Sequence, residues 1–424
     1  MTAFSIKEFL SRVVGLSSKH DHYTDFGWPE NVTFWQLHKM YERNDLAKAS
    51  VKKTTEKTFQ NLPVILRNDI EDTELSDAFD RLGFWDKLAD LDEYAQVGGY
   101  SGLVIRIADG KSFAEPIDGS VSLDDLVEII PAWSEQLKVS EWHLDETDPD
   151  TYGKPKTFTF NESAITREGA NRSVVVHPDR VFVWSSTGDT VNCVSALLSG
   201  YNNLLDMEKI SGAGGEGFWK TAAARLNIQI DKATDFQAFK QAIEASDPSK
   251  SFQEILDEKA KKLNSGFDTS YISQGMNVAP FSISLPQPKE FFDIPLASYA
   301  AGRSMPVKEL VGMQTGERAS TQDAQAWNNA IMSRRNRWTI PSIRALLQQM
   351  ERFGMISAGW VIEWDDLTDD TPQAKLDRAD KMADINTKQT ATESQPVFTG
   401  EEIRIEAGYD GEVPDAFDDM GLEE

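Results

Sequence analysis

The chain has 424 residues, of which 40% are hydrophobic and 26% charged, and its formal net charge is −26. This composition indicates a folded protein that is too long for one ordinary core, so two to four domains are expected. Because like charges repel at long range, the negative charge argues against tight binding of nucleic acid by the whole surface. No run of about 18 apolar residues suggests a membrane span. The single cysteine, Cys193, excludes an internal disulfide and a cysteine zinc cluster.

The first hundred residues are expected to form a polar opening followed by helices. Residues 1–30 are interpreted as a polar, irregular arm that ends near Trp28. A helix is predicted over residues 32–60, because apolar residues recur there at steps of three and four. Two further helices are predicted at residues 71–82 and 85–96.

A β-rich part follows in the chain. The glycine-flanked apolar run Leu103–Ile107 predicts a buried strand within residues 98–110. Residues 121–190 contain short runs rich in branched and aromatic side chains, separated by turn clusters such as residues 145–155. We therefore expect several short strands in this region.

Helices are expected to dominate the second half, which begins with a helical pattern from Asn192. Glycines 212, 214, 215 and 217 are expected to interrupt that helix. Later strands are predicted at 226–230, 277–285 and 359–364, and later helices at 234–246, 249–264, 286–303, 320–335, 339–353 and 372–389.

The motifs that could carry chemistry are weak. The glycine run lacks a closing Gly-Lys-Ser/Thr and follows a helix, so a flexible break between helices is favoured over a phosphate-binding loop. Aspartates 365, 366, 369 and 370 could suggest a metal site, but no histidine or basic partner accompanies them, and a solvated loop is favoured. No catalytic, cofactor-binding or metal-binding residue is assigned.

Two charged groups lie near the C-terminus. Five arginines between residues 334 and 352 are expected to serve as ion-pair partners at helical spacing, with a subunit contact as one location for such pairs, rather than as a nucleic-acid patch. They are Arg334, Arg335, Arg337, Arg344 and Arg352. Residues 401–424 hold ten acids and one base, which indicates either a solvated tail or a segment that docks on a partner.

Several motifs resemble those of one family. The segment VVVHPDRVFVWSS, residues 174–186, resembles the strand of tailed-bacteriophage portal proteins that carries His-Pro-x-Arg-Val. Residues 284–335 resemble the portal segment in which a helix ends in a small residue, a proline, a leucine and a glycine. The equivalents here are Ala300, Pro306, Leu310 and Gly312, followed by Gly316. FTGEEIR, residues 398–404, resembles a helix start near portal C-termini.

The resemblance extends in order over most of residues 35–405 and implies a mainly helical α+β fold with the portal architecture. The implied parts are an N-terminal arm (1–35), a wing (36–195 with 320–362), a stem and channel region (196–224 and 281–319), a clip (225–280), and a small crown with an acidic tail (363–424). Lys289, Glu290, Arg303 and Lys308 are the residues expected to face the channel.

The resemblance also implies a function and partners. A portal protein forms a ring, usually of twelve subunits, at one capsid vertex, where double-stranded DNA passes without sequence specificity. The expected partners are the large terminase subunit, a head–tail adaptor, and a major capsid or scaffolding protein. The expected location is the virion, with assembly in the host cytoplasm, and neither enzymatic activity nor a cofactor is implied. The alternatives are another virion structural protein, such as a head–tail adaptor or minor capsid protein, and a metal-dependent phosphoesterase using the aspartates near 365.

Overall fold

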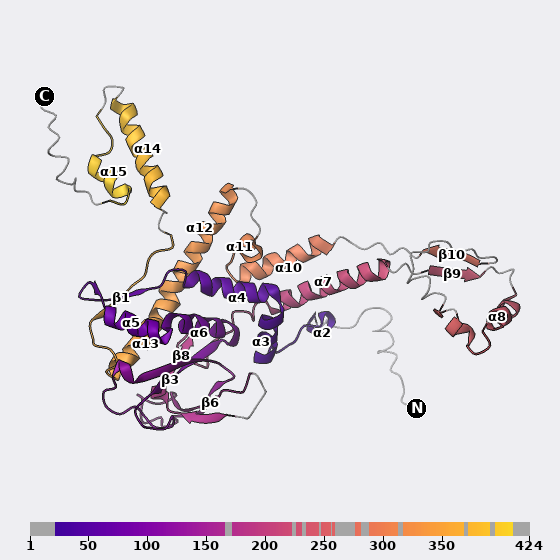
Figure 1. Ribbon diagram of the computed structural model, residues 1–424, viewed down its shortest axis with the longest axis horizontal. Coiled ribbons are helices and arrows are strands. Elements are labelled where there is room, and N and C mark those ends of the chain that lie inside the picture. Colours follow the sequence, from indigo (N-terminus) through magenta and orange to yellow (C-terminus); the bar gives the residue numbers. More distant parts are fainter. Residues whose placement is uncertain are drawn as a thin grey trace, which may run out of the picture. The chain divides into compact units, whose positions relative to one another are not determined.

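The protein is described by a computed structural model in which helices and small antiparallel sheets alternate (Figure 1). The described residues are 22–165, 172–222, 226–230, 235–245, 247–255, 257–258, 276–280, 288–312, 317–368, 372–390 and 395–409. Two compact units divide the chain, and each is built from separated stretches of sequence. The first comprises Met1–Glu56, Leu82–Asp118 and Asp124–Gln314, and the second comprises Lys57–Arg81, Gly119–Leu123 and Thr315–Glu424. The mainly helical α+β class expected from the sequence is confirmed.

The helical stretch predicted over 32–60 is confirmed, and it consists of two helices rather than one. Helix α3 (Phe34–Arg43) starts in a capping box between Thr33 and Gln36. Asn44 then has extended backbone angles, φ −101° and ψ 117°. Its Oδ1 accepts hydrogen bonds from the amides of Leu46 and Ala47, at 3.1 and 3.0 Å. An asparagine that satisfies the first amides of the next helix competes with helix continuation, so α4 (Asp45–Thr58) begins anew.

Two more N-terminal helices lie where the sequence predicts them. They are α5 (Thr73–Leu82) and α6 (Phe84–Gly98). Helix α6 buries Phe84, Leu88 and Leu91, which share one face at helical spacing, and this face packs against strands β3 and β4. The polar opening contains one short helix, α2 (His22–Phe26).

The β-rich part of the first unit forms two three-stranded antiparallel sheets, which confirms the strands expected there. One has the order β4-β3-β8 and the other β5-β6-β7. The strands are β3 (Tyr100–Ile107), β4 (Leu126–Trp133), β5 (Leu137–Trp142), β6 (Pro155–Asn161), β7 (Ser173–Val176) and β8 (Val181–Ser185).

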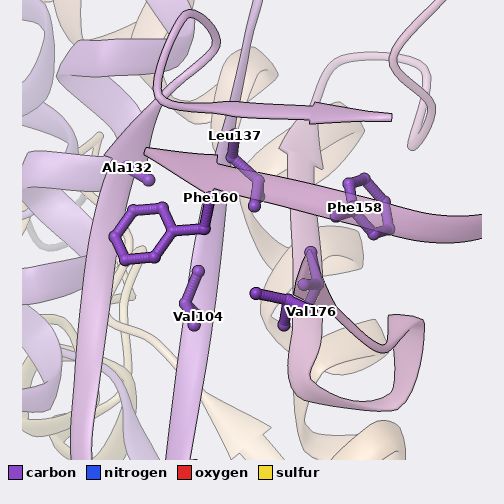
Figure 2. Packing of buried hydrophobic residues seen from close by; sticks show 7 residues of the cluster. Val104, Ala132, Leu137, Phe158, Phe160 and Val176 are labelled. Atoms are coloured by element: carbon purple, nitrogen blue, oxygen red, sulfur yellow. The ribbon is translucent and has the colours of Figure 1, made fainter. Parts of the chain in front are cut away.

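A hydrophobic core joins these two sheets (Figure 2). Its buried members come from β3, β4, β5, β6, β7 and β8, and they are Val104, Ala132, Leu137, Phe158, Phe160, Val176 and Val181. Packing here is close enough to require a glycine. A Cβ added to Gly102 in β3 would lie 2.0 Å from Cδ2 of Leu137, far inside contact distance.

Helix α7 (Tyr201–Ala222) runs unbroken through all four glycines, so the predicted interruption at 212–217 was wrong. Glycine lowers helix stability by about 1 kcal/mol per residue but does not forbid the helix. Tertiary packing accounts for its persistence in part, because α7 lies beside α10 (Pro288–Gly302). The two run in opposite directions: Gly200 lies near Tyr299, and Ile210 near Phe291.

A small antiparallel pair of strands follows α7 in the chain. Strand β9 (Leu226–Ile230) pairs with β10 (Met276–Pro280), and α8 (Phe236–Glu244) lies between them in sequence. These elements confirm that strands lie near 226–230 and 277–285 and a helix near 234–246, as predicted, with somewhat different ends. In the helix predicted at 249–264, residues 252–255 and 257–258 are helical, and residues 256 and 259–264 lie outside the described part of the chain.

The second unit combines one small sheet with a long helical segment. Strands β11 (Trp360–Glu363), β1 (Val64–Arg67) and β2 (Ile70–Glu71) are antiparallel in that order. Helix α12 (Glu317–Arg334) passes through a π-helical turn, Arg335–Thr339, into α13 (Ile340–Arg352). The remaining described helices are α14 (Pro372–Thr390) and α15 (Gly400–Glu406), and α15 starts in a capping box between Thr399 and Glu402.

Candidate functional site

The His-Pro-Asp-Arg segment between β7 and β8 is a structural connection. His177 caps a short 3-10 helix, Pro178–Arg180, by accepting the amide of Asp179 at its Nδ1, 3.2 Å away. The amide of His177 itself donates to the carbonyl of Phe113 at 2.8 Å. The motif therefore fixes a sharp turn and directs the chain into β8.

Arg180 is the buried centre of this turn, with 1% of its surface exposed. Its Nε donates to the carbonyl oxygen of Glu115 at 2.9 Å, and its Nη2 forms an ion pair with Asp109. Burial raises the pKa of the Asp109 carboxyl, but the hydrogen bond and charge of Arg180 outweigh it, so that pKa lies below its usual range. The arginine thus ties the start of β8 to the loop after β3.

The second motif that carried the resemblance forms the turn from α10 into α11 (Val307–Val311). Ala300 is buried, and its carbonyl accepts the amide of Met305 at 3.0 Å. Pro306 precedes the first turn of α11, and Leu310 is buried on its inner side. Gly312 ends α11 with φ 78°, a left-handed conformation that glycine adopts without strain. The fifth member of the motif, Gly316, lies outside the described residues.

Arg303 at this turn is held by acceptors of its own unit. Its guanidinium donates to the carbonyl oxygens of Ala196 and Ser50, at 3.3 and 3.2 Å. It also donates to Gln96 Oε1 at 2.7 Å. From the opposite side, Lys53 of α4 donates to the carbonyl oxygens of Glu309 and Leu310, at 2.6 and 3.3 Å. Two cations therefore bind the α10–α11 turn to α4 and α6.

A buried polar relay connects Arg303 to a carboxylate. Gln96 accepts from Arg303 and, through Nε2, donates to Asp92 Oδ2 at 3.1 Å and to Thr55 Oγ1 at 2.9 Å. Asp92 is fully buried and also accepts from the indole of Trp184 at 3.3 Å. The Gln96 amide thus links a cation to an anion by two hydrogen bonds. Such a network holds the end of α10 in one geometry against α4 and α6.

The four residues expected to face a channel occupy different environments. Lys289 and Glu290 are exposed in the first turn of α10, and Lys308 in α11 is half-buried. Arg303 is partly buried in the polar network just described. Sequence reasoning missed Gln96, Asp92 and Lys53 as its surroundings, because contacts across 200 or more residues leave no local pattern.

Tyr299, one turn before Arg303, completes the contact between α10 and α4. It is fully buried, and its hydroxyl is 2.5 Å from Ser50 Oγ. Burial raises the pKa of this phenol. A Cβ on Gly200 would come within 2.4 Å of the Tyr299 ring, so the glycine before α7 is what lets the two helices meet here.

Arg335 is the most deeply placed member of the arginine group in the second unit. It is fully buried, and it donates to the carbonyl of Thr58, to Asn61 Oδ1 at 2.7 Å and to the carbonyl of Asp365 at 3.0 Å. Burial lowers its pKa to about 10, against the opposing effect of Asp366 and Asp365. Arg334 stacks on Trp338 instead, 4.1 Å from the ring centre. These contacts join elements within the second unit.

The aspartates near residue 365 are divided by their surroundings. Asp366 Oδ1 accepts from the hydroxyl and amide of Thr368, at 2.6 and 2.7 Å, and these bonds lower its pKa. Asp369 and Asp370 lie outside the described residues. Within the part of the chain that is described, no group of three or more metal-ligating side chains converges. No helix among those residues is long and apolar enough to cross a membrane.

Comparison with solved structures places the fold among particle neck assemblies. A chain in the virion of the native gene transfer agent (GTA) particle matches with TM-score 0.51 and 16% identity, covering 90% of this chain and 94% of that one. A chain in the neck of the native GTA particle, computed with C12 symmetry, matches with TM-score 0.50 and 16% identity, covering 95% and 99%. A chain in the neck of the empty particle, computed with C6 symmetry, has TM-score 0.51 and 15% identity and covers 90% and 94%. No protein of curated function matches.

The phage portal protein family matches residues 35–388. That range contains the first two motifs on which the resemblance rested, whereas the third, residues 398–404, lies beyond its end. Of the helices described above, α2 and α15 fall wholly outside it. The portal identity and function expected from the sequence are therefore confirmed. The chain belongs to the phage portal protein family, whose members form the ring at one capsid vertex through which DNA passes.

Proposed function

We propose that twelve copies of this chain close into the portal ring, with α7 and α10 in the stem. The neck of the native GTA particle, computed with C12 symmetry, supports this copy number for a chain of the same fold. A closed ring needs a head-to-tail interface in which one surface of each copy meets a different surface of the next. One of these two surfaces must let the backbone of the neighbouring copy come close to it.

The glycine-rich stretch of α7 is the observation that carries this proposal. Gly212 and Gly215 are exposed, and a Cβ added at either would meet no atom within 4 Å among the described residues. Packing within the described part of the subunit therefore does not account for them, although each weakens the helix by about 1 kcal/mol. Glycines on a helix surface allow another backbone to approach closely. A neighbouring copy in the ring supplies that backbone.

The ring and its interface can be tested on the purified full chain. Native mass spectrometry should give about 570 kDa, twelve times the 47.4 kDa chain, and negative-stain images should show a central hole. Gly212→Leu with Gly215→Leu should prevent closure while leaving the subunit folded, because there is room for both side chains. Gly212→Ala with Gly215→Ala is the milder control. Rings that form normally with both leucines would refute the interface.

The predicted channel surface is proposed to begin at the first turn of α10. Lys289 and Glu290 are exposed there, which supports a position facing the channel. Arg303 and Lys308 are proposed for the same surface near the α10–α11 turn. The hydrogen bonds to Ser50, Ala196 and Gln96 hold the Arg303 guanidinium in place. Arg303 would therefore be a fixed part of the channel wall and not a mobile charge.

The remaining domains follow the family plan. We assign the arm to 1–35, the wing to 36–195 with 320–362, the stem and channel region to 196–224 and 281–319, the clip to 225–280, and the crown with its tail to 363–424. The pairing of β9 with β10 supports a distinct clip. The clip would contact the large terminase subunit during packaging and a head–tail adaptor afterwards, and a major capsid or scaffolding protein would contact the outer surface.

The net charge of −26 supports a channel through which double-stranded DNA slides without sequence preference. An acidic wall holds phosphates weakly, whereas a strongly basic wall would slow the DNA. Neutralising the acids that line the channel in the assembled ring should slow packaging. An unchanged packaging rate at every salt concentration would refute this mechanism.

Assembly in the host cytoplasm, and the absence of enzymatic activity and of a cofactor, complete the proposal. The competing function, a metal-dependent phosphoesterase, would use the carboxylates of Asp365 and Asp366. In this chain the Asp366 carboxylate accepts two hydrogen bonds from Thr368, and the backbone carbonyl of Asp365 accepts one from Arg335. A metal-dependent activity lost in Asp365→Ala with Asp366→Ala would favour that enzyme. A compact assembly without a central hole would favour an adaptor or minor capsid protein.

A further inference from the structure

An apolar groove in the first unit lies along the paired helices α7 and α10. Its volume is about 540 Å³, and its apolar lining comes from Phe26, Trp28, Ile210, Phe291, Ile294 and Pro295. Ile294 and Phe291 have 69% and 57% of their surface exposed. Asn203, Asp206 and Lys209 of α7 form the polar side. A groove with this lining fits a helix that carries an apolar stripe.

The end of α2 and the residues that follow it line this groove. The indole of Trp28 donates to Asp206 Oδ1 at 2.9 Å, and Phe26 packs on Trp28 with ring centres 5.0 Å apart. Lys209 donates to the carbonyl of Phe26 and pairs with Asp206 at 3.1 Å. These contacts anchor residues 26–28 on α7. Helix α2 is joined directly to this anchor, and residues 1–21 before it lie outside the described part of the chain.

The sequence of residues 1–21 contains a pattern that is typical of a helix. Ile6, Phe9, Leu10, Val13 and Val14 recur at the spacing of one helix face. Ser5 and Glu8 have the spacing of a capping box, and Gly15 stands where a helix commonly ends. Lys7, Ser11 and Arg12 fall on the opposite face. The sequence therefore predicts an amphipathic helix over residues 6–14.

We propose that this N-terminal helix, residues 6–14, docks by its apolar stripe in the groove of the same chain. The lengths agree: nine helical residues span about 13.5 Å, and the α7 wall from Asn203 to Ile210 spans about 10.5 Å at the same rise. Residues 16–21 connect the helix to α2 and can reach about 20 Å when extended. The inference goes beyond the ring, since it applies to a single copy.

Charge also favours this occupant. Residues 1–21 contain three bases and two acids, whereas the whole chain carries −26. The segment is thus slightly basic on a strongly acidic protein, and long-range attraction favours its return to the surface.

Hydrogen–deuterium exchange of the full chain tests the docking. Leu10→Asp places a charge in the apolar stripe, and Ser11→Asp places the same charge on the polar face. In a monomeric sample, Leu10→Asp should speed amide exchange in residues 203–210 and 289–295 by about tenfold, and Ser11→Asp should leave it unchanged. Equal exchange in both variants and the wild type would overturn the proposal.

A disulfide assay separates the same chain from a neighbouring copy. In a Cys193→Ser background, Ile294→Cys is combined in turn with Phe9→Cys, Leu10→Cys or Val13→Cys and oxidised. At least one pair should close within the monomer, whereas Arg12→Cys as control should not. Cross-linked dimers would assign the groove to a neighbour's segment and overturn same-chain docking. Failure of all three pairs to close would also count against it.

Discussion

The two-sheet core and the paired helices α7 and α10 solve the packing problem differently within one unit. In the core, seven apolar side chains from two sheets are at least nine-tenths buried, and Gly102 is required by the Leu137 side chain beside it. In the paired helices, Ile294, Phe291, Gly212 and Gly215 remain exposed. The core is complete in a single chain, whereas the helices carry surfaces that suit further contacts.

Glycine illustrates this difference most directly. At Gly102 the missing side chain makes room for a neighbour in the same subunit, and at Gly215 no neighbour is present within 4 Å. The same residue type is thus explained by packing in one region and by assembly in the other. Mutations in the two regions should therefore affect stability and assembly separately.

The largest effect on stability is expected from the core. Phe160→Ala removes a ring with 2% exposure and should lower the free energy of unfolding by about 3–5 kcal/mol, from lost burial and the cavity left behind. Urea denaturation followed by fluorescence measures it. Val175→Ala in β7, where the side chain is 47% exposed, is the control and should change stability by less than about 0.5 kcal/mol. Equal losses in both variants would contradict the assigned core.

A smaller effect is expected from the buried pair beside the core. Arg180 lowers the pKa of Asp109 in the folded state, so the pair's contribution is present above the unfolded pKa of about 4 and is lost as pH falls through the folded value. Asp109→Asn should lower stability by about 1.5–3 kcal/mol at pH 7, and the gap to wild type should narrow as the pH falls below 4. Asp118→Asn, at an exposed ion pair with Lys111, should have little effect at either pH. A gap that stays constant with pH would contradict the shifted pKa.

The smallest effects are expected from two glycine substitutions with opposite signs. Gly102→Ala should destabilise the chain by about 1–3 kcal/mol, because its Cβ would overlap Leu137. Gly215→Ala should stabilise monomeric subunits by about 0.5–1 kcal/mol, since it improves helix propensity in open space. Thermal unfolding of monomeric samples compares them. Effects of the same sign would remove the distinction between the two regions.

The accuracy of the sequence predictions depended on how local the deciding interactions are. The helix at 400–406 was predictable, because its capping box lies within four residues. The break at Asn44 is also local, yet apolar spacing continues through it and concealed the cap. The glycines of α7 led to the wrong prediction of a break, because whether a helix continues depends on more than the helix propensity of single residues.

The sequence by itself determined the class of fold, most helices and strands, and the family, because periodicity and motif order are written along the chain. Only the tertiary structure decided what the motif residues do. Arg180 pairs with Asp109, and Gln96 links Arg303 to Asp92, across separations that local patterns do not encode. The apolar groove beside α7 likewise exists only because residues near 26, 206 and 294 come together on folding. Such sites arise from packing between distant segments, which is why neither spacing nor composition revealed them.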